Sequence, residues 1–377
     1  MVLLLPYMRI GFDAKRAFLN STGLGNYSRW LINALVKHHP ENEYLLYTPK
    51  VKPGIYTPLR PTQIKTPKLK FLTSRWRSNG IRYDLKRDGI ELYHGLSHEL
   101  PFGINQSGIR SVVTVHDLIF IRFPQYFGWI NRYIYEAKLV YACRVANRII
   151  AISQKTKNDL VELLKVDPEK IEVIYQSCDA SFKTEQSDVH KQAVKQKYNL
   201  PDQYLLSVGT IEPRKNLLLL VKALGQVADI KLVVVGKPTA YLDEVKAYIG
   251  QHELNDRVIF LHNVKFDELP AIYRQASCFI YPSRYEGFGI PILEALCAGT
   301  PAIGATGSCL EEAGGPDSLY TDPDNEFQLA GLIMQVLGDE NLRQNMITKG
   351  LAYSRNFADD KLAAQHAELY KNVLKDA

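Results

Sequence analysis

Residues 283–301 read SRYEGFGIPILEALCAGTP, and the order of glycine, proline and apolar residues predicts a turn that leads directly into a helix. Pro291 suits the first helical position, because its missing N–H would be unpaired there and its φ is already helical. Gly287 and Gly289 have no Cβ just before that helix, so a ligand can approach the backbone. The free N–H groups at such a helix start favour a phosphate group.

Two glutamates lie on either side of this turn, and both would repel a phosphate. Glu286 precedes the turn, and Glu294 is expected within the first turn of the helix. The phosphate can then lie between them while both carboxylates accept hydrogen bonds from hydroxyl groups. A ligand with hydroxyl groups on both sides of a diphosphate is a nucleotide sugar. The alternative, a glutamate that complements the helix dipole, accounts for Glu294 and leaves Glu286 unexplained.

Short apolar runs rich in β-branched residues recur along the chain, with helical segments between them. Their apolar character is continuous, which is typical of strands buried on both faces of a parallel sheet covered by helices. We therefore predict an α/β protein. The runs are MRIGFDA (8–14), EYLLYTP (43–49), ELYHGLS (91–97), SVVTVHDL (111–118), RIIAISQ (148–154), IEVIYQS (171–177), QYLLSVGT (203–210), IKLVVVGK (230–237), RVIFLHN (257–263), CFIYPSR (278–284) and PAIGATG (301–307).

The chain length of 377 residues favours two domains. The pattern of strands and helices predicts an open doubly wound sheet in each half. A polar stretch without a strand pattern (179–203) is the best linker candidate, and we expect domains over residues 1–183 and 184–356. Residues 357–377 read as one amphipathic helix with an apolar face, which we expect to return to the N-terminal domain. That face is formed by Leu362, His366, Leu369 and Val373.

Composition excludes several classes of protein. The five cysteines are scattered, without a C-x-x-C pair or a histidine at ligand spacing, so neither a disulfide framework nor a zinc site is expected. The apolar run at the start of the chain is too short for a secretory signal or a membrane span, and Met8 is an alternative start to Met1. We expect a cytoplasmic protein.

The net charge of +6 is unevenly distributed. Residues 50–87 contain 11 Lys and Arg and one acid, Asp84, which gives this stretch a charge of +10 and the remainder −4. Phe71, Trp76 and Tyr83 are interleaved with the cations. Such a stretch could contact anionic lipid headgroups at the inner face of the membrane, form a solvated surface, or line a groove for an anionic acceptor. No nucleic-acid motif accompanies it.

Ligands of open α/β sheets bind beyond the carboxyl ends of the strands, and polar residues follow several of the predicted strands. We therefore expect a ligand site formed by these strand ends. The candidate residues are His116, Asp117, Arg214, Lys215, Lys237, Asn263 with the adjacent Val264, and Glu286.

The stretch that includes Glu286 and Glu294 resembles the E-x7-E motif of the retaining glycosyltransferases of family 4, which have the GT-B architecture. The resemblance extends to SVGTIEPRKN, AISQKTKNDL, STGLGNYSRWL, VTVHDL and GTPAIGATGSCLEEAGG, and so covers nearly the whole chain. It implies two Rossmann-like domains with a cleft between them. It further implies that Glu286 contacts hydroxyls of the donor sugar, that Glu294 binds the ribose, and that the backbone from Phe288 through Gly289 to Ile290 holds sugar and phosphate.

The motif IEPRKN places two adjacent cations after a strand. Arg214 can bind a diphosphate leaving group bidentately and Lys215 can act as a point charge, as matching residues do in the family; a chance surface pair is the alternative. Because these cations can take the leaving-group charge, we expect neither a metal nor another cofactor. The Asp322-Pro-Asp324 sequence is expected to form a turn and a helix cap.

Two further motifs belong to the N-terminal half. Gly23 and Gly25 are predicted to form a flexible loop over the donor, before a helix that starts near Tyr27. His116, with Asp117 beside it, is predicted to contact the donor sugar, although a lone histidine after a strand is often a core residue. His94 and His98 are predicted to lie in a loop on the acceptor side.

The resulting hypothesis is a retaining transferase that moves a sugar, preferably mannose from GDP-mannose, to a glycan or lipid-linked glycan. A UDP-sugar-dependent transferase and a nucleotide-sugar epimerase remain alternatives, as do a dehydrogenase, which lacks its full glycine fingerprint here, and a membrane scaffold. Two departures from the family pattern, at 175–179 and at Glu311, leave the donor open.

Overall fold

The structure, a computed structural model, describes residues 7–60, 62–68 and 72–376 and divides the chain into two compact units. Unit 1 comprises Met1–Ser177 and Phe357–Ala377, and unit 2 comprises Cys178–Asn356. The division precedes helix α8 (Ala180–Lys183), whereas the sequence placed it after residue 183. Helix α8 belongs to unit 2 because Arg274 of that unit donates hydrogen bonds to the Phe182 carbonyl at 2.9 Å and the Thr184 carbonyl at 2.9 Å.

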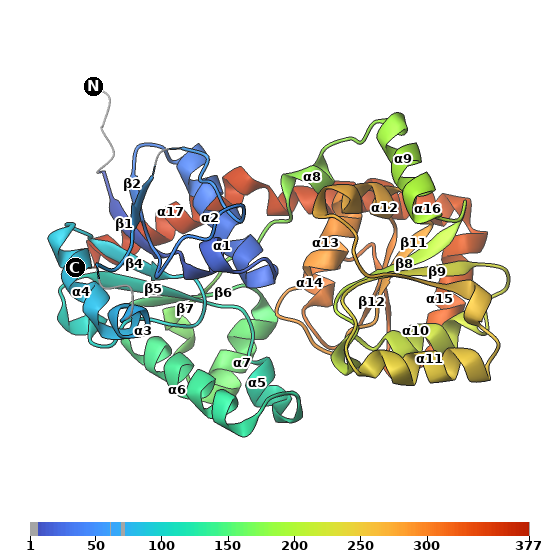
Figure 1. The fold of residues 1–377 in the computed structure, drawn as a ribbon, viewed down its shortest axis with the longest axis horizontal. Helices are drawn as coiled ribbons and strands as arrows, with labels where there is room; N and C mark the ends of the chain where they lie inside the picture. The colour runs from blue at the N-terminus through green and yellow to red at the C-terminus, as the bar shows by residue number, and fades with distance from the viewer. Residues whose placement is uncertain (1–6, 61, 69–71, 377) are drawn as a thin grey trace. The chain divides into compact units, whose positions relative to one another are not determined.

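Unit 1 is built on a seven-stranded sheet ordered β3-β2-β1-β4-β5-β6-β7 (Figure 1). All its ladders are parallel, as the continuous apolar runs predict, and Ile10 of β1 pairs with Leu92 of β4. The strands are β1 (Arg9–Asp13), β2 (Glu43–Tyr47), β3 (Gln63–Lys65), β4 (Leu92–Gly95), β5 (Arg110–Val115), β6 (Arg148–Ala151) and β7 (Ile171–Val173).

Helices cover both faces of this sheet (Figure 1). Helices α1 (Lys15–Leu19), α2 (Gly23–His38) and α17 (Asp359–Lys375) lie together on one face. On the other face, apolar side chains of α4 (Ile81–Arg87), α6 (Trp129–Val145) and α7 (Gln154–Leu164) join one core with the strands. Shorter helices are α3 (Thr73–Arg75), continued by a π-helical turn (Trp76–Gly80), and α5 (Ile119–Arg122).

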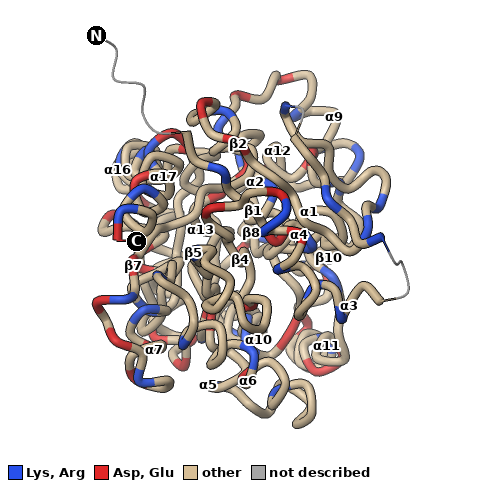
Figure 2. Tube along the Cα trace, turned by 90° about the vertical axis from the view of Figure 1, so that its left-hand side faces the viewer, with Lys and Arg blue, Asp and Glu red and all other residues tan. Residues whose placement is uncertain are grey.

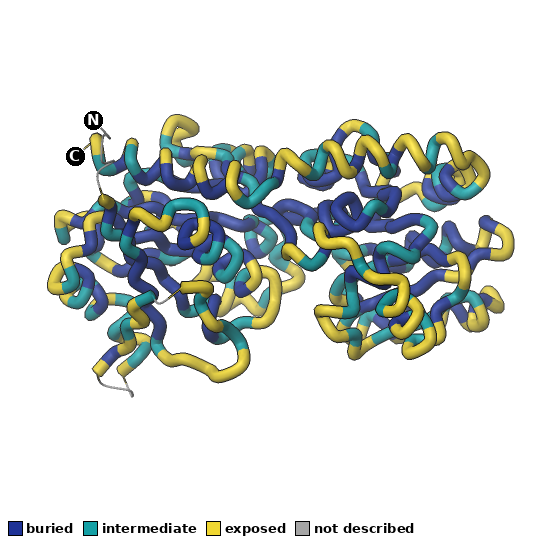
Figure 3. The backbone as a smooth tube through the Cα atoms, turned by 90° about the horizontal axis from the view of Figure 1, so that it is seen from above, coloured by how far each residue is buried: buried dark blue, intermediate teal, exposed yellow. Residues whose placement is uncertain are grey.

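Unit 2 has a six-stranded parallel sheet ordered β10-β9-β8-β11-β12-β13. Its central strands β11 and β12 are buried along their whole length (Figure 3). Leu205 of β8 pairs with Cys278 of β11 at the centre of the sheet. The strands are β8 (Tyr204–Val208), β9 (Lys231–Val235), β10 (Val258–Leu261), β11 (Cys278–Tyr281), β12 (Ala302–Ala305) and β13 (Leu319–Thr321).

The helices of unit 2 also lie on both faces of its sheet (Figure 1). Helices α10 (Leu217–Leu224), α11 (Tyr241–Gln251) and α15 (Glu326–Gly338) share one apolar core on one face. The remaining helices are α9 (Asp188–Tyr198), α12 (Leu269–Gln275), α13 (Ile290–Cys297), α14 (Leu310–Gly314) and α16 (Glu340–Ser354). Helix α9 lies inside the polar linker candidate (179–203) and coincides with its helix-like stretch DVHKQAVKQKY.

The C-terminal helix packs within unit 1. Its predicted apolar face, formed by Leu362, His366, Leu369 and Val373, is buried as expected. The Trp30 indole of α2 donates a hydrogen bond of 3.0 Å to Asp359 at the start of α17. Tyr370 lies 2.7 Å from His94 Nδ1, so the helix also contacts strand β4.

Both sheets reverse their strand order at a defined point. In unit 1 this point lies between β1 and β4, and in unit 2 it lies between β8 and β11. Ligands of open α/β sheets bind at such points, beyond the carboxyl ends of the strands. The loops that follow these four strands are therefore the places where functional residues are expected.

Two further predictions concern the whole chain. The five cysteines are free thiols, all of them buried, and Cys178 Sγ lies 3.2 Å from Cys297 Sγ. Among the residues that the structure describes, no helix is both long and apolar enough to cross a bilayer. Met1 lies outside the described residues.

Candidate active site

The loops after β8 and β11 meet at the reversal point of unit 2. Gly289 adopts φ +107°, a conformation that favours glycine, and α13 begins at the next residue. A Cβ at Gly289 would lie 2.7 Å from Leu310 Cδ2, so α14 packs closely against this position. Pro291 is the second residue of the helix, where its missing N–H costs no hydrogen bond.

Glu286 is the centre of the site. Its Oε1 accepts hydrogen bonds from Ser283 Oγ at 2.7 Å and Tyr281 OH at 2.9 Å. The same oxygen forms ion pairs with Lys215 Nζ at 2.5 Å and Arg214 NH1 at 2.8 Å. Within the described parts of the chain, Oε2 of Glu286 has no hydrogen-bond partner. One oxygen thus holds the loop and the other is left for a ligand.

The two cations of IEPRKN are both engaged by carboxylates. Arg214 forms a second ion pair with Glu212, at 2.5 Å, and Lys215 also contacts Tyr281 OH. Two cations and two carboxylates therefore balance in this structure. The sequence predicted the cations but not that Glu212 and Glu286 neutralise them.

These contacts set the protonation states of the cluster. Burial raises the pKa of Glu286, but the charges of Lys215 and Arg214 outweigh it and lower the pKa to about 2. Burial lowers the pKa of Lys215, and Glu286 opposes that shift. Glu286 is consequently a carboxylate at neutral pH, able to accept a hydrogen bond from a hydroxyl.

Glu294 occupies a different place from the one predicted. Helix α13 begins at Ile290 and contains no acidic residue in its first turn, so Glu294 lies in the second turn. Its side chain is buried, and Oε2 accepts a hydrogen bond of 3.0 Å from Tyr273 OH. Burial, with Cys297 and Asp179 nearby, raises the pKa of Glu294 to about 8 despite the Tyr273 hydrogen bond. The side chain is therefore mostly protonated at neutral pH.

The other candidates of unit 2 follow strands on the same edge of the sheet. Lys237 is exposed after β9, and its carbonyl accepts a hydrogen bond of 2.9 Å from Ile211 N. Asn263, which is exposed, and Val264, which is half-buried, follow β10. Because β9 and β10 are the next strands beside β8, these residues share the carboxyl edge with Arg214. Gly287 and Phe288 are buried in the turn before α13.

The Asp322-Pro-Asp324 sequence forms a turn, as predicted. Asp324 N donates to Asp322 Oδ1 at 2.8 Å, and the cap of α15 is the neighbouring Asn325, whose side chain accepts from Gln328 N at 2.9 Å. Asp324 pairs with Arg284 at 2.6 Å. No cluster of three or more potential metal ligands occurs in the described ranges.

In unit 1, His116 lies at the end of β5 and is buried. Its Nε2 lies 2.9 Å from the Leu96 carbonyl, and its backbone N donates to His98 Nε2 at 2.8 Å. Burial and the neighbouring His98 lower the pKa of His116 to about 3, so the ring is neutral. Asp117 Oδ1 accepts from Ile119 N at 3.1 Å. These contacts are those of a satisfied core histidine, and a contact of His116 with the donor stays a prediction.

Two predictions for unit 1 are wrong about local structure. Gly23 and Gly25 lie in the first turn of α2, where Gly25 N bonds to the Thr22 carbonyl at 2.9 Å, and not in a loop. A Cβ at Gly25 would lie 1.9 Å from the Asn20 carbonyl oxygen, so glycine allows this close packing. His94 lies in strand β4, buried under α17, whereas His98 lies in the following loop.

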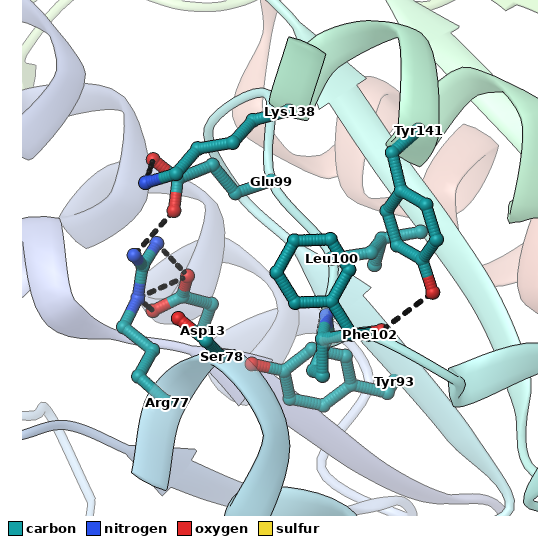
Figure 4. A pocket seen from close by; sticks show the side chains of 10 residues that line it. Asp13, Arg77, Ser78, Tyr93, Glu99, Leu100, Phe102, Lys138 and Tyr141 are labelled. Atoms are coloured by element: carbon teal, nitrogen blue, oxygen red, sulfur yellow. Dashed lines mark hydrogen bonds and ion pairs between the residues drawn. The ribbon is translucent and has the colours of Figure 1, made fainter. Parts of the chain in front are cut away.

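Sequence reasoning missed a second charged cluster, at the reversal point of unit 1. Arg77 binds Asp13, the last residue of β1, at 2.5 Å, and also binds Glu99, which follows β4 (Figure 4). Lys138 of α6 pairs with Glu99 at 3.3 Å. Burial lowers the pKa of Arg77, but Asp13 and Glu99 outweigh it and raise the pKa. The signal in the sequence was Asp13 at the end of a predicted strand.

The basic stretch 50–87 is less uniform than its composition suggests (Figure 2). Arg77 is used internally, Lys65 pairs with Asp88 at 3.6 Å, and Arg87 pairs with Asp84 at 2.6 Å. The remaining described cations are mostly exposed. Lys70 and Phe71, which the prediction included, lie outside the described residues.

Comparison with known proteins identifies the group to which the chain is related. The model of Glycosyltransferase Family 4 matches residues 22–182, and that of Glycosyl transferases group 1 matches residues 188–352. O-antigen chain mannosyltransferase B of Escherichia coli is 29% identical over 287 residues, which cover 74% of each chain. An O-antigen chain mannosyltransferase of Salmonella typhimurium is 29% identical over 320 residues, 81% of this chain and 85% of the relative.

Solved structures show the same fold. Sucrose-phosphate synthase from Thermosynechococcus elongatus superposes with a TM-score of 0.76 and 19% identity, over 98% of this chain and all of that one (100%). Anabaena HepE, solved with UDP and glucose, gives a TM-score of 0.74 and 18% identity, over 97% and 100%. The matches favour a hexosyltransferase over the epimerase, dehydrogenase and scaffold considered above. With the two family models together spanning most of the chain, the protein belongs to the family 4 glycosyltransferases of the GT-B type.

Proposed function

We propose that this glycosyltransferase moves mannose from GDP-mannose to a hydroxyl of a glycan or lipid-linked glycan in cell-surface polysaccharide synthesis, with retention of anomeric configuration. The observation that carries the donor site is Glu286, with Oε1 bound to two cations and Oε2 directed to no partner within the described chain. An ionised carboxylate held in this way is suited to accept hydrogen bonds from sugar hydroxyls. The curated relatives support mannose, since both are mannosyltransferases of O-antigen chains.

In the proposed complex, the diphosphate lies between Arg214, Lys215 and the start of α13. The backbone from Phe288 to Ile290 contacts sugar and phosphate, and Glu294 binds the ribose. Lys237, Asn263 and Val264 complete the donor side. No metal is assigned a role, because two cations and a helix N-terminus can stabilise the leaving-group charge.

The proposed reaction needs no carboxylate nucleophile. The acceptor oxygen attacks the anomeric carbon from the face that the diphosphate leaves, and the bond from that carbon to the phosphate oxygen breaks. The acceptor proton passes to the departing phosphate oxygen, while Arg214 and Lys215 stabilise its charge. In unit 1, His116 and Asp117 would contact the sugar. The turn around Gly23 and Gly25 would contact the diphosphate.

The enzyme is proposed to work in the cytoplasm, where the exposed cations of residues 50–87 can contact anionic headgroups at the inner face of the membrane. The support is the charge of this stretch and the acceptor class. Because exposed charges are screened by salt, such contact should weaken as ionic strength rises.

A thermal-shift panel tests the donor. GDP-mannose, GDP-fucose, UDP-glucose, UDP-galactose, UDP-GlcNAc and ADP-glucose are compared on the wild type, on Arg214→Ala and on Arg284→Ala. Arg284 is the matched control, because it is an arginine of the same unit that pairs with Asp324. At 100 times its Kd a ligand stabilises the protein by about 2.7 kcal/mol. We expect the GDP-mannose shift to shrink in Arg214→Ala and to persist in the control.

The outcomes separate the parts of the proposal. If only UDP sugars stabilise the protein, the donor is a UDP sugar and not GDP-mannose. If the shifts are equal in all three proteins, Arg214 does not bind the donor. The configuration of the product, read by NMR of its anomeric proton, tests retention. A glycosyl group trapped on any carboxylate would contradict same-face attack.

A further inference from the structure

Unit 1 contains a groove of about 710 Å³ beyond the carboxyl ends of its first three strands. This volume lies within the roughly 300–1,000 Å³ of small-molecule sites. Its walls are formed by helix α1, by residues 49–51 after β2, by residues 66 and 67 after β3, and by residues of α3 and the π-helical turn. Its charged lining consists of four cations, Lys15, Lys50, Arg77 and Lys138, and no acidic residue of the described chain lines it.

The cations divide into two pairs with different surroundings. Arg77 and Lys138 are neutralised by Asp13 and Glu99, and all four side chains line an adjoining small pocket (Figure 4). Lys15 forms no ion pair with any residue of the described ranges, and neither does Lys50. Against the carboxylates of Asp13 and Glu99, the four cations leave an excess of two positive charges at the groove.

The positive potential is high enough to affect a lysine of the wall. Lys15 is half-buried, and its burial and the charge of Arg77 lower its pKa, although the charges of Glu99 and Asp13 oppose that shift. An anion bound beside Lys15 would oppose both effects. The groove thus has an excess of positive charge, and its lining in the described chain contains no acidic side chain.

The remaining polar lining consists of hydroxyl groups. Four residues with hydroxyl groups line the groove, and in the parts of the chain that the structure describes none has a hydrogen-bond partner for its side chain. Hydroxyls can donate to phosphate oxygens, and lysines bind phosphate as point charges. The four residues are Thr66, Thr73, Ser74 and Ser78.

We propose that this groove binds a phosphate-bearing part of the acceptor, which is either the diphosphate that joins a glycan to its lipid or a phosphate on the glycan. The proposal rests on the proposed transferase function and names the acceptor's chemistry. A concave wall with a half-buried lysine and four hydroxyl-bearing residues suits a discrete phosphate group. A flat lipid surface would instead meet exposed cations such as Lys52, Arg60 and Lys68.

The first test is a calorimetric titration with inorganic pyrophosphate in saturating GDP, which keeps the donor diphosphate site occupied. The groove variant is Lys15→Ala/Lys50→Ala, and the matched control is Lys52→Ala/Lys86→Ala, which removes the same charge from exposed positions outside the groove. We expect binding to weaken at least tenfold in the groove variant and to stay within twofold in the control. Equal affinities in both variants would overturn the proposal.

A second pair of measurements separates the possible ligands. Transfer to a lipid diphosphate acceptor and to a phosphorylated soluble glycan is compared in both variants, and a raised KM at constant kcat for either one supports the groove and identifies the source. If the groove variant loses only binding to phosphatidylglycerol vesicles, the stretch contacts membrane and the proposal is wrong. If the double variant misfolds, the titration is repeated with the single variant Lys50→Ala, whose position is exposed.

The donor measurement is independent of these tests. The GDP thermal shift depends on unit 2, where Arg214 and Lys215 lie. Should GDP fail to bind while pyrophosphate binding still depends on Lys15 and Lys50, the proposed function fails and the anion groove stands. If GDP binds but pyrophosphate binding does not depend on Lys15 and Lys50, the proposed transferase function stands and the phosphate site in the groove is wrong.

Discussion

Glu294→Gln is expected to stabilise the protein, by an amount that grows with pH. Burial raises the pKa of Glu294 from its ordinary 4.5 to about 8. Between these values the unfolded chain has lost the proton and the folded protein keeps it, so the stability of the wild type falls as pH rises. Glutamine has no proton to lose, and its carbonyl oxygen can still accept the hydrogen bond from Tyr273.

The slope inside this window is roughly 1.4 kcal/mol per pH unit. From about pH 5.5 to about pH 7.5, the advantage of the variant should therefore grow by roughly 2 to 3 kcal/mol. Urea denaturation of both proteins at each pH measures it, and the difference between them cancels groups that titrate in both. Glu244→Gln, at an exposed position on α11, is the control and should show no such slope. An advantage that is the same at both pH values would refute the reasoning.

The same variant links stability to the donor. If Glu294 binds ribose as proposed, Glu294→Gln should stabilise the free protein and reduce the thermal shift that GDP produces. Because binding by an ionised carboxylate requires loss of the proton, wild-type affinity for GDP should rise with pH up to about 8, the pKa of the group. A variant with unchanged GDP affinity at every pH would separate the burial of Glu294 from any role in binding.

Glu286→Gln should be about 3 kcal/mol less stable than the wild type at pH 7. This deficit should shrink as pH falls from 4.5 towards the wild-type pKa of about 2, because protonation of Glu286 removes the same ion pairs. Urea denaturation across this pH range measures the deficit, and a deficit that does not change with pH would contradict the prediction. Gly289→Ala should destabilise unit 2 by roughly 1 to 3 kcal/mol, since its Cβ would lie 2.7 Å from Leu310 Cδ2 at a φ of +107°. Thermal denaturation tests this, and a neutral effect would show that the turn can shift. Tyr370→Phe removes the 2.7 Å contact with His94 Nδ1 and should cost about 0.5–1.5 kcal/mol, with faster hydrogen exchange in α17; unchanged exchange there would argue against this anchor.

Local patterns were sufficient to predict the buried strands and the turn at Gly289. The continuous apolar runs predicted the parallel strands, but the edge strands β3 and β13 were missed because each has three residues and partly exposed side chains. Glu294 lies in the second turn of α13 and not in the first, because the helix begins at Ile290, directly after the left-handed Gly289.

Contacts between distant residues could not be read from local patterns. Arg214 and Glu286 are 72 positions apart by number, and their pairing follows only from the adjacency of β8 and β11. The cluster of Asp13, Arg77 and Glu99 likewise needs the β1–β4 reversal and a turn of irregular helix. Residue types therefore predicted the chemistry of the donor site, while the fold determined which charges neutralise one another.

The position of α17 has a consequence for synthesis of the chain. Residues 178–356 of unit 2 are contiguous, whereas unit 1 requires Phe357–Ala377, which are translated only after all of unit 2. Domains fold as units during synthesis, generally from the N-terminus. Here the second unit can finish first, because the partners of α17, such as Trp30 and His94, lack this helix until it has left the ribosome. A nascent chain that stalls before residue 359 would carry a completed unit 2 and an unfinished unit 1, an arrangement that exposes the apolar surface under α17 to chaperones.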